Sequence, residues 1–136
     1  MAVKTEEEIE SDFYLFITNS VIAKTIKGKV YRDEMRPANS TAEDLVLKFL
    51  AGLDEQVQTG VVIVNLYVPD ITNKDGRKVI DHTRVKVLQK VINQFVEENS
   101  DTEYCITKDG TPTTLQNKEI GQHCIYVRLK FQRITV

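Results

Sequence analysis

The sequence has few of the residues that cross-link, interrupt or anchor a chain. Its 136 residues include two cysteines, three prolines and no tryptophan. Two cysteines are too few for a disulfide-stabilised scaffold of this size, which favours a reducing, intracellular setting. The apolar runs are short and interrupted by polar residues, so we expect no membrane-spanning helix. The first residues are acidic, without the charged-then-apolar order of a signal peptide, and we expect none.

The chain also lacks a surplus of positive charge. Lys and Arg together number 18 and Asp and Glu number 20, which gives a net charge of −2. Phosphate contacts dominate the affinity of nucleic-acid-binding proteins, which therefore usually carry a basic surplus. The composition argues against a dedicated nucleic-acid binder and leaves room only for a local basic patch. Hydrophobic residues at 41% and a length of 136 fit one globular domain spanning residues 1–136.

Recognisable motifs for nucleotides, cofactors or metals are absent from the sequence. The glycines are scattered and form no phosphate-binding loop or nucleophile elbow. His82, Cys105, His123 and Cys124 lack the paired spacing of a structural zinc site. His123 and Cys124 are adjacent on a predicted strand, so their side chains point to opposite faces. Both cysteines lie in β-patterned segments, which favours inert packing. We expect no catalytic residue, no cofactor and no metal.

The apolar pattern predicts two amphipathic helices. The first covers residues 5–22, where acidic residues crowd the first turns and Thr5 with Glu8 matches a capping box. The second covers residues 80–98, with Asp81 as a candidate N-cap. The apolar stripes that define these helices are Ile9, Phe13, Phe16, Ile17 and Val21 in the first, and Val87, Leu88, Val91, Ile92 and Phe95 in the second.

The other regular segments are typical of strands. The clearest is 57–68, whose centre is β-branched and almost continuously apolar, so we expect it to be central in a sheet and buried on both faces. Shorter strands are predicted at 29–32, 44–50 and 102–108. From 120 to 136 apolar and polar residues alternate, which is typical of a sheet with one solvated face. This order predicts an α+β domain with a largely antiparallel sheet and both helices packed on one face.

Two long polar loops and one charged strand face are the candidate interaction surfaces. Loops 32–43 and 69–79 exceed the usual connection of about 4–6 residues, and long polar loops in compact domains are often functional. Tyr126, Arg128 and Lys130 share a face of the last strand, which is interpreted as a solvated surface, a subunit interface or a charged lumen. The residues expected at an assembly surface are Arg32, Arg36, Asn73, Lys74, Asp75, Arg128, Lys130 and Arg133.

The succession of elements along the chain is the basis of a family resemblance. An N-terminal helix leads to Ile26-Lys27-Gly28-Lys29-Val30-Tyr31, and a loop with Arg36-Pro37 follows. The apolar strand at 61–68, the helix at 80–98 and the closing Tyr126-Val127-Arg128-Leu129-Lys130-Phe131 complete the order. In this order the chain resembles the small tail-completion or tail-terminator proteins of tailed bacteriophages. The resemblance implies a structural subunit of a ring, a hexamer, that closes the tail tube at the head-tail joint.

The same resemblance implies the partners and the location. The partners are further copies of the chain together with other tail or connector proteins. DNA is a partner only by passing through the lumen of the ring, and neither a membrane nor a small-molecule substrate is involved. The protein would lie in the virion, or in the host cytoplasm during assembly, which is the bacterial cytoplasm if a prophage encodes it.

Two other functions stay open on the sequence. The first is a small intracellular adaptor or regulatory domain that binds one protein partner, which predicts an exposed apolar patch larger than a few hundred Å². The second is an enzyme whose site is assembled from dispersed residues such as Asp81, His82 or Cys105. The enzyme requires a concave pocket where titratable groups converge.

Overall fold

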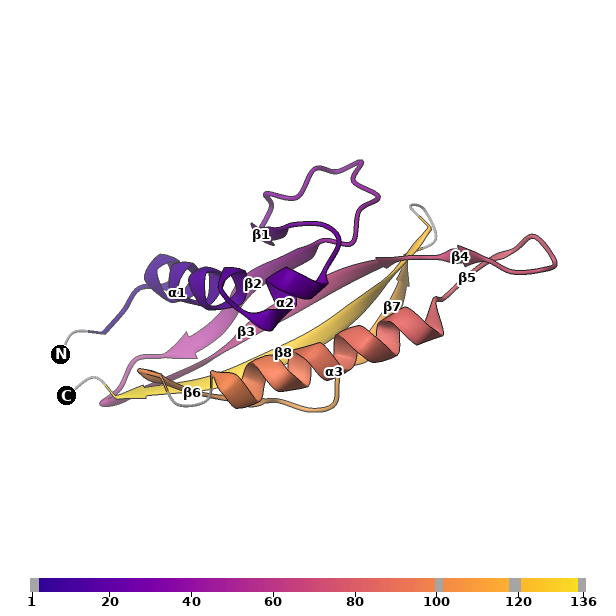
Figure 1. Cartoon of the computed structure of the whole chain (residues 1–136). Coiled ribbons are helices and arrows are strands. Elements are labelled where there is room, and N and C mark those ends of the chain that lie inside the picture. Colours follow the sequence, from indigo (N-terminus) through magenta and orange to yellow (C-terminus); the bar gives the residue numbers. More distant parts are fainter. Residues whose placement is uncertain (1–2, 100–101, 118–120, 135–136) are drawn as a thin grey trace.

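A computed structural model describes residues 3–99, 102–117 and 121–134. The helices are α1 (Glu6–Thr18), α2 (Val21–Thr25) and α3 (His82–Glu98). The strands are β1 (Val30–Arg32), β2 (Leu45–Leu53), β3 (Val57–Pro69), β4 (Ile71–Thr72), β5 (Lys78–Val79), β6 (Tyr104–Lys108), β7 (Thr113–Asn117) and β8 (Gln122–Ile134). Figure 1 shows an elongated molecule in which β4 and β5 extend beyond one end of the main sheet.

The main sheet has the strand order β1-β2-β3-β8-β6. Among the strands of the described residues, only β1 and β2 are parallel, and the other neighbours are antiparallel, which confirms the α+β class with a largely antiparallel sheet. The long strands β3 and β8 pair over their whole length. On the other edge of β8, β6 pairs with residues 129–133 and β7 with residues 122–126. Strand β7 was not predicted, because its sequence Thr-Thr-Leu-Gln-Asn carries no apolar alternation.

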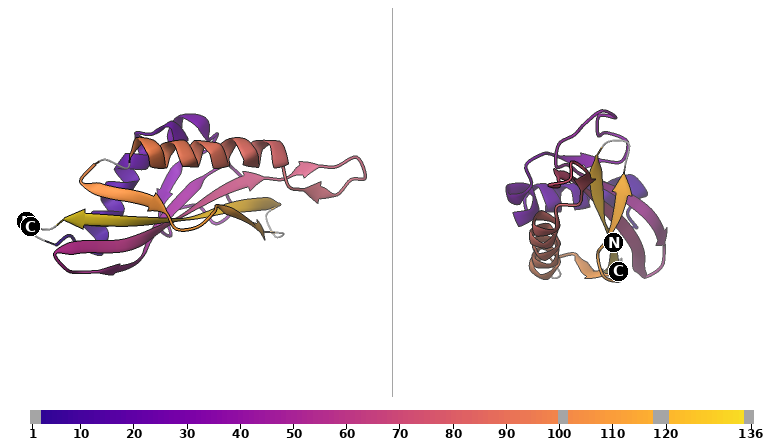
Figure 2. Two further views of the ribbon diagram at one scale, coloured as in Figure 1. Left: turned by 90° about the horizontal axis from the view of Figure 1, so that it is seen from below. Right: turned by 90° about the vertical axis from the view of Figure 1, so that its right-hand side faces the viewer.

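The core lies between the helices and one face of this sheet. Alternate residues of β3 are buried there, from Val62 to Val68, and the residues between them are only half-buried. Strand β3 is therefore central, as expected, but its predicted burial on both faces is wrong. Figure 2 shows the reason, since α3 lies along one side of the sheet and none of the described helices lies below the sheet in the left view.

The first predicted helix is interrupted. Helix α1 ends at Thr18 with Asn19 as its C-cap, and α2 starts after Ser20. The Ser20 hydroxyl donates to the carbonyl of Ile17 at 2.7 Å and accepts from the N–H of Ile22 at 3.2 Å. Serine favours such a capping position because its oxygen satisfies a free backbone donor. The single helix predicted over 5–22 is therefore two helices.

The two longer helices begin as the sequence predicts. Thr5 and Glu8 form the capping box of α1, and the Asp81 carboxylate accepts from the N–H of Arg84 at 3.1 Å to cap α3. The core stripe of α3 differs from the predicted one, because Val87 is exposed and Val85 takes its place in the core. Aromatic rings fill the core beneath α1, with Phe13 5.2 Å from Tyr104 and 5.6 Å from Phe131 between ring centroids.

Candidate assembly surfaces

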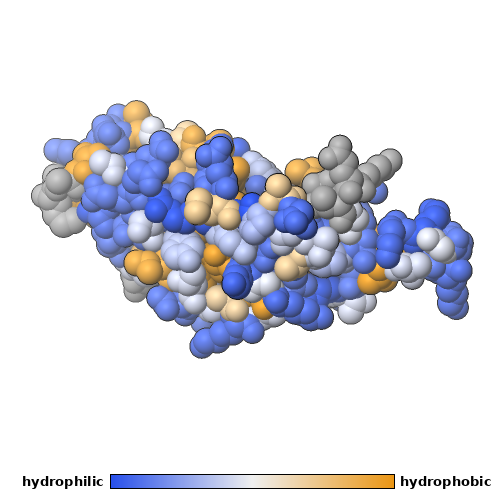
Figure 3. All heavy atoms as spheres, turned by 90° about the horizontal axis from the view of Figure 1, so that it is seen from above, coloured by the Kyte–Doolittle hydropathy of each residue, from blue (hydrophilic) through white to orange (hydrophobic). Residues whose placement is uncertain are grey.

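The most exposed candidate surface is the hairpin formed by β4 and β5, named below the arm (residues 71–79). Its turn places Gly76 at φ 87°, and the N–H of Asn73 donates to the carbonyl of Arg77 at 2.8 Å. The turn at Asp75-Gly76 was predicted, whereas the two short strands replace a predicted loop. Residues 71–78 are all exposed. Figure 3 shows the arm projecting from the body with a largely hydrophilic surface.

The arm brings together three of the residues expected at an assembly surface. Asn73, Lys74 and Asp75 lie at or near its tip. Arg77 pairs with Asp75 at 2.6 Å, and Nζ of Lys78 donates to the Thr72 hydroxyl at 2.9 Å. Both contacts lie on the surface of the arm and leave its charges exposed to solvent. With Lys74, Arg77 and Lys78 against one carboxylate, the arm carries two net positive charges.

Arg36 has a different role from the one its sequence position suggested. Its side chain is only 10% exposed and pairs with Asp44 at 3.1 Å. The same guanidinium donates to the carbonyls of Ser40 and Ala42 and lies 4.0 Å from the ring centroid of Tyr67. Arg36 thus lies between the loop after β1 and the sheet and holds the two together. Little of its side chain is left exposed for a partner.

The acid that Arg36 binds is one of two adjacent buried acids that sequence analysis missed. Glu43 pairs with Arg84 of α3 at 2.6 Å, which ties α3 to the segment preceding β2. Asp44 also accepts from the Lys29 N–H at 2.8 Å and from the Ser40 hydroxyl at 2.6 Å. Burial opposes ionisation of Asp44, but these donors and Arg36 together hold the pKa of its carboxyl below the ordinary value. The only signal of this site in the sequence was that two acids, Glu43 and Asp44, are adjacent at the start of a predicted strand.

Arg32 lies on a surface of opposite charge to the arm. It pairs with Glu7 at 2.8 Å and with the buried Glu10 at 2.9 Å, which joins β1 to the first turns of α1. A groove runs between these elements, and it is lined by Glu6, Glu7, Glu10, Arg32, Asp33, Glu34 and Met35. We call this the acidic groove. Arg32, whose side chain is 31% exposed, thus lies within an acidic environment.

Arg128 and Lys130 lie on the sheet face that turns away from the helices, which we call the outer face. Arg128 stands in register with Ile63 of β3, and Ile63 with Lys48 of β2, so two cations flank an apolar side chain. Arg128 is 38% exposed and pairs with Asp109 at 3.1 Å. Around Arg128 and Lys130 the outer face is therefore a mixed apolar and basic surface that is open to solvent or to a partner.

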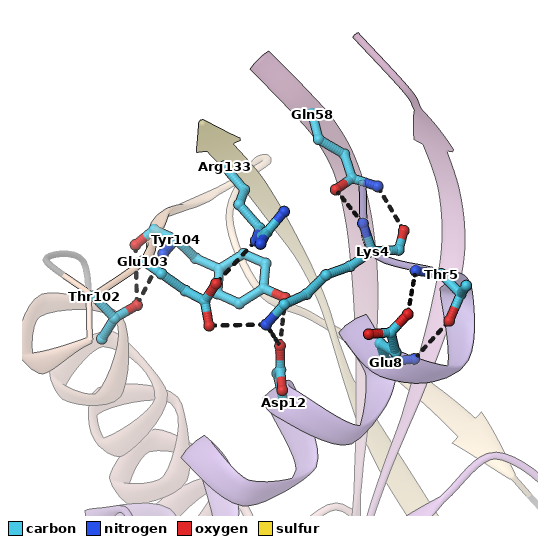
Figure 4. A network of polar contacts seen from close by, with 9 residues as sticks. All are labelled: Lys4, Thr5, Glu8, Asp12, Gln58, Thr102, Glu103, Tyr104 and Arg133. Carbon is cyan, nitrogen blue, oxygen red and sulfur yellow. Dashed lines mark hydrogen bonds and ion pairs between the residues drawn. The ribbon is translucent and has the colours of Figure 1, made fainter. Parts of the chain in front are cut away.

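Arg133 faces the helix side of the sheet, so it does not join Arg128 and Lys130. Its side chain is 4% exposed and pairs with Glu103 at 2.9 Å. Glu103 also binds Lys4, and Lys4 binds Asp12 of α1, whose carboxylate accepts from the Tyr104 hydroxyl at 2.7 Å. Figure 4 shows this network joining the segment before α1 to α1, β6 and β8. Arg133 therefore holds the fold together at this end of the sheet.

The histidines and cysteines do not converge. His82 is exposed at the start of α3, and Cys105 is exposed on the outer face, on the opposite side of the sheet. The expectation that both cysteines are packed inside is wrong for Cys105. Cys124 is buried, and Nδ1 of His123 lies 2.5 Å from the carboxylate of Asp70. Among residues 3–99, 102–117 and 121–134, no group of three or more His, Cys, Asp or Glu could hold a metal ion.

Comparison with known proteins adds no family assignment. No known protein family and no curated protein matches the sequence significantly. None of the helices in the described part of the chain combines the length and the apolar character needed to cross a membrane. The functional argument therefore rests on the arm, the acidic groove and the outer face.

Proposed function

We propose that the chain is a structural protein whose copies assemble into a ring, in the manner of a phage tail-completion or tail-terminator protein at the head-tail joint. The observation that carries this proposal is the arm, which projects from the body with residues 71–78 exposed. The protein acts by assembly with itself and with tail or connector proteins, without a catalytic residue or a cofactor.

The physics of a short hairpin supports a contact at the arm. An isolated two-stranded hairpin is marginally stable in water. The arm has only two paired positions, Ile71 with Val79 and Thr72 with Lys78. Ile71 is 47% exposed at its base, although it is a large apolar residue. Packing against a neighbouring subunit would stabilise the hairpin and cover this side chain.

The shape of the molecule supports a ring over a symmetric dimer. The arm projects from one end of an elongated body, and α1 lies at the other end in both Figure 1 and Figure 2. A contact between two different surfaces repeats from copy to copy and closes into a ring when the rotation closes. The mixed basic outer face, with Arg128 and Lys130, is suited to a lumen through which DNA slides without being gripped.

Negative-stain electron microscopy of the purified protein at high concentration tests this proposal. We expect annular particles with a central opening, and we expect the same particles to bind the ends of purified tail tubes. Uniform small particles without an opening, both alone and with tail tubes, would contradict a ring-forming tail protein.

A second candidate function, the protein-binding adaptor, is favoured by an apolar patch at one end of the outer face. Leu53, Val57 and Ile134 are 57%, 43% and 63% exposed, and Val57 pairs with Ile134 in register. The substitution Leu53→Asp separates the two functions. An adaptor that binds through this patch would lose its partner, whereas a ring that assembles through the arm would still form.

A further inference from the structure

The arm and the acidic groove have opposite charges. The groove contains the carboxylates of Glu6, Glu7, Glu10, Asp33 and Glu34 and one guanidinium, from Arg32. Because Arg32 is bound by Glu7 and Glu10, its charge is already neutralised inside the groove. The exposed rim that remains, Glu6 and Glu34, is negative. The arm, with its two net positive charges, is opposite to this rim in sign.

Each surface also exposes an apolar side chain. Met35 of the groove is 67% exposed, and Ile71 at the base of the arm is 47% exposed. Protein interfaces commonly bury apolar residues such as methionine in a core that is surrounded by a polar rim. The arm and the groove thus have complementary charges, and each exposes one large apolar side chain.

The arm cannot reach the groove of its own chain. Figure 1 and the left view of Figure 2 show the arm at one end of the body and α1, whose first turns line the groove, toward the other. A second copy of the chain is therefore the source of the groove that the arm would meet. Such a contact joins two different surfaces, so each copy can give one arm and receive another.

We propose that the arm of one copy lies in the acidic groove of the next copy. The cations of the arm face Glu6 and Glu34 of that copy, and Ile71 packs near its Met35. This inference rests on the proposed self-assembly and names its contact. Because the charges are exposed, they act on the rate and the specificity of assembly, and salt weakens them.

Charge reversal in the full-length chain tests the contact. The arm variant carries Lys74→Glu and Lys78→Glu, and the groove variant carries Glu6→Lys and Glu34→Lys. Each variant alone should self-associate about tenfold more weakly or worse, because like charges then meet at the interface. A chain with all four substitutions should assemble again. A matched control with Lys86→Glu and Lys90→Glu, both exposed on α3, should assemble as the wild type does.

Mixing the two variants gives a second readout. The acidic arm of the arm variant fits the basic groove of the groove variant, and the basic arm of the groove variant fits the acidic groove of the arm variant. An equimolar mixture should therefore form assemblies in which the two variants alternate, which sedimentation velocity detects. Circular dichroism establishes that each variant is folded. Assembly of the arm variant at wild-type strength would overturn the inference, as would failure of the fourfold variant and of the mixture.

The outcomes also separate this inference from the proposed function. If the wild type does not associate, both fail. If the wild type and both variants associate equally, the ring stands and the arm-to-groove contact is wrong. If the arm variant assembles normally but loses retention on duplex DNA at low salt, the arm binds phosphate and the inference is again wrong.

Discussion

A Cβ atom at Gly28 would overlap the Oδ1 atom of Asp44. It would also lie 2.5 Å from the backbone carbonyl oxygen of Glu43. The N–H of Gly28 donates to that carbonyl at 3.0 Å, and the N–H of Lys29 donates to Asp44 at 2.8 Å. Glycine thus lets the chain before β1 lie directly against the start of β2. The Gly28-Lys29-Val30-Tyr31 segment, which contributes to the family resemblance, has a structural reason of its own.

Replacing Gly28 by alanine should destabilise the fold. The added methyl must displace backbone or a buried carboxylate, and overpacking of this kind costs about 1–3 kcal/mol. Urea unfolding followed by circular dichroism measures the loss. The neighbouring Lys27→Ala, an exposed side chain, serves as control and should change the free energy of unfolding by less than about 0.5 kcal/mol. Equal urea midpoints for the two variants would show that the backbone accommodates the added methyl group without loss of stability.

Arg36→Met should cost far more than the same change at Arg128. Removing Arg36 leaves Asp44, whose side chain is 2% exposed, without its buried counter-charge. Breaking a buried ion pair in this way costs about 3–5 kcal/mol. Arg128→Met removes an exposed pair with Asp109, worth about 0–1 kcal/mol. Unfolding midpoints of both variants give the comparison, and a similar loss at the two sites would refute a structural role for Arg36.

Stability should fall in acid because of Asp44 and Glu103. Burial opposes ionisation of Asp44, but its donors lower its pKa below the ordinary value. Arg133 and Lys4 do the same for Glu103. Both groups are therefore harder to protonate in the folded chain than in the unfolded chain. Both groups contribute their full stabilisation at pH values above their pKa in the unfolded chain, which is about 4. This stabilisation is lost as the pH falls further. Urea midpoints between pH 7 and 3 measure this, and Asp44→Asn should flatten the profile. If the urea midpoint of that variant depends on pH as in the wild type, Asp44 does not contribute to the loss of stability in acid.

The two cysteines should differ in reactivity. Cys105 is exposed on the outer face, whereas burial raises the pKa of the Cys124 thiol to about 12. Only the thiolate reacts with a disulfide reagent, so one thiol per native chain should react quickly at pH 8. In denaturant both should react. Rapid labelling of native Cys105→Ser would show that Cys124 is accessible.

Local sequence rules predicted those parts of the fold that are determined by contacts between residues close in the sequence. Thr5 with Glu8 and Asp81 cap helices through bonds within three residues. The alternation in β8 correctly separates Leu129 from Arg128, because side chains alternate along a strand. The interruption between α1 and α2 depends on the capping of α2 by Ser20. The spacing of apolar residues does not reveal such a cap.

The rest of the structure depends on long-range packing. The composition of β3 does not reveal that one of its faces lacks a covering helix, so burial on both faces was expected. Arg36 and Arg133 were predicted at a surface because they are charged, but both are largely buried in ion pairs. Arg36 pairs with the buried Asp44, and Arg133 pairs with Glu103, which is 43% exposed. The arm was predicted as a loop, since two paired positions leave too little pattern to reveal strands.

Light scattering after size exclusion, on the wild type and on a chain lacking residues 72–77, tests the central claim most directly. At high concentration the wild type should give a discrete assembly, about 94 kDa for six copies of the 15.6 kDa chain. The deletion should stay monomeric with unchanged circular dichroism, because it removes the arm and leaves the main sheet intact. A wild type that remains at 15.6 kDa at every concentration, or a deletion that assembles as the wild type does, would contradict assembly through the arm.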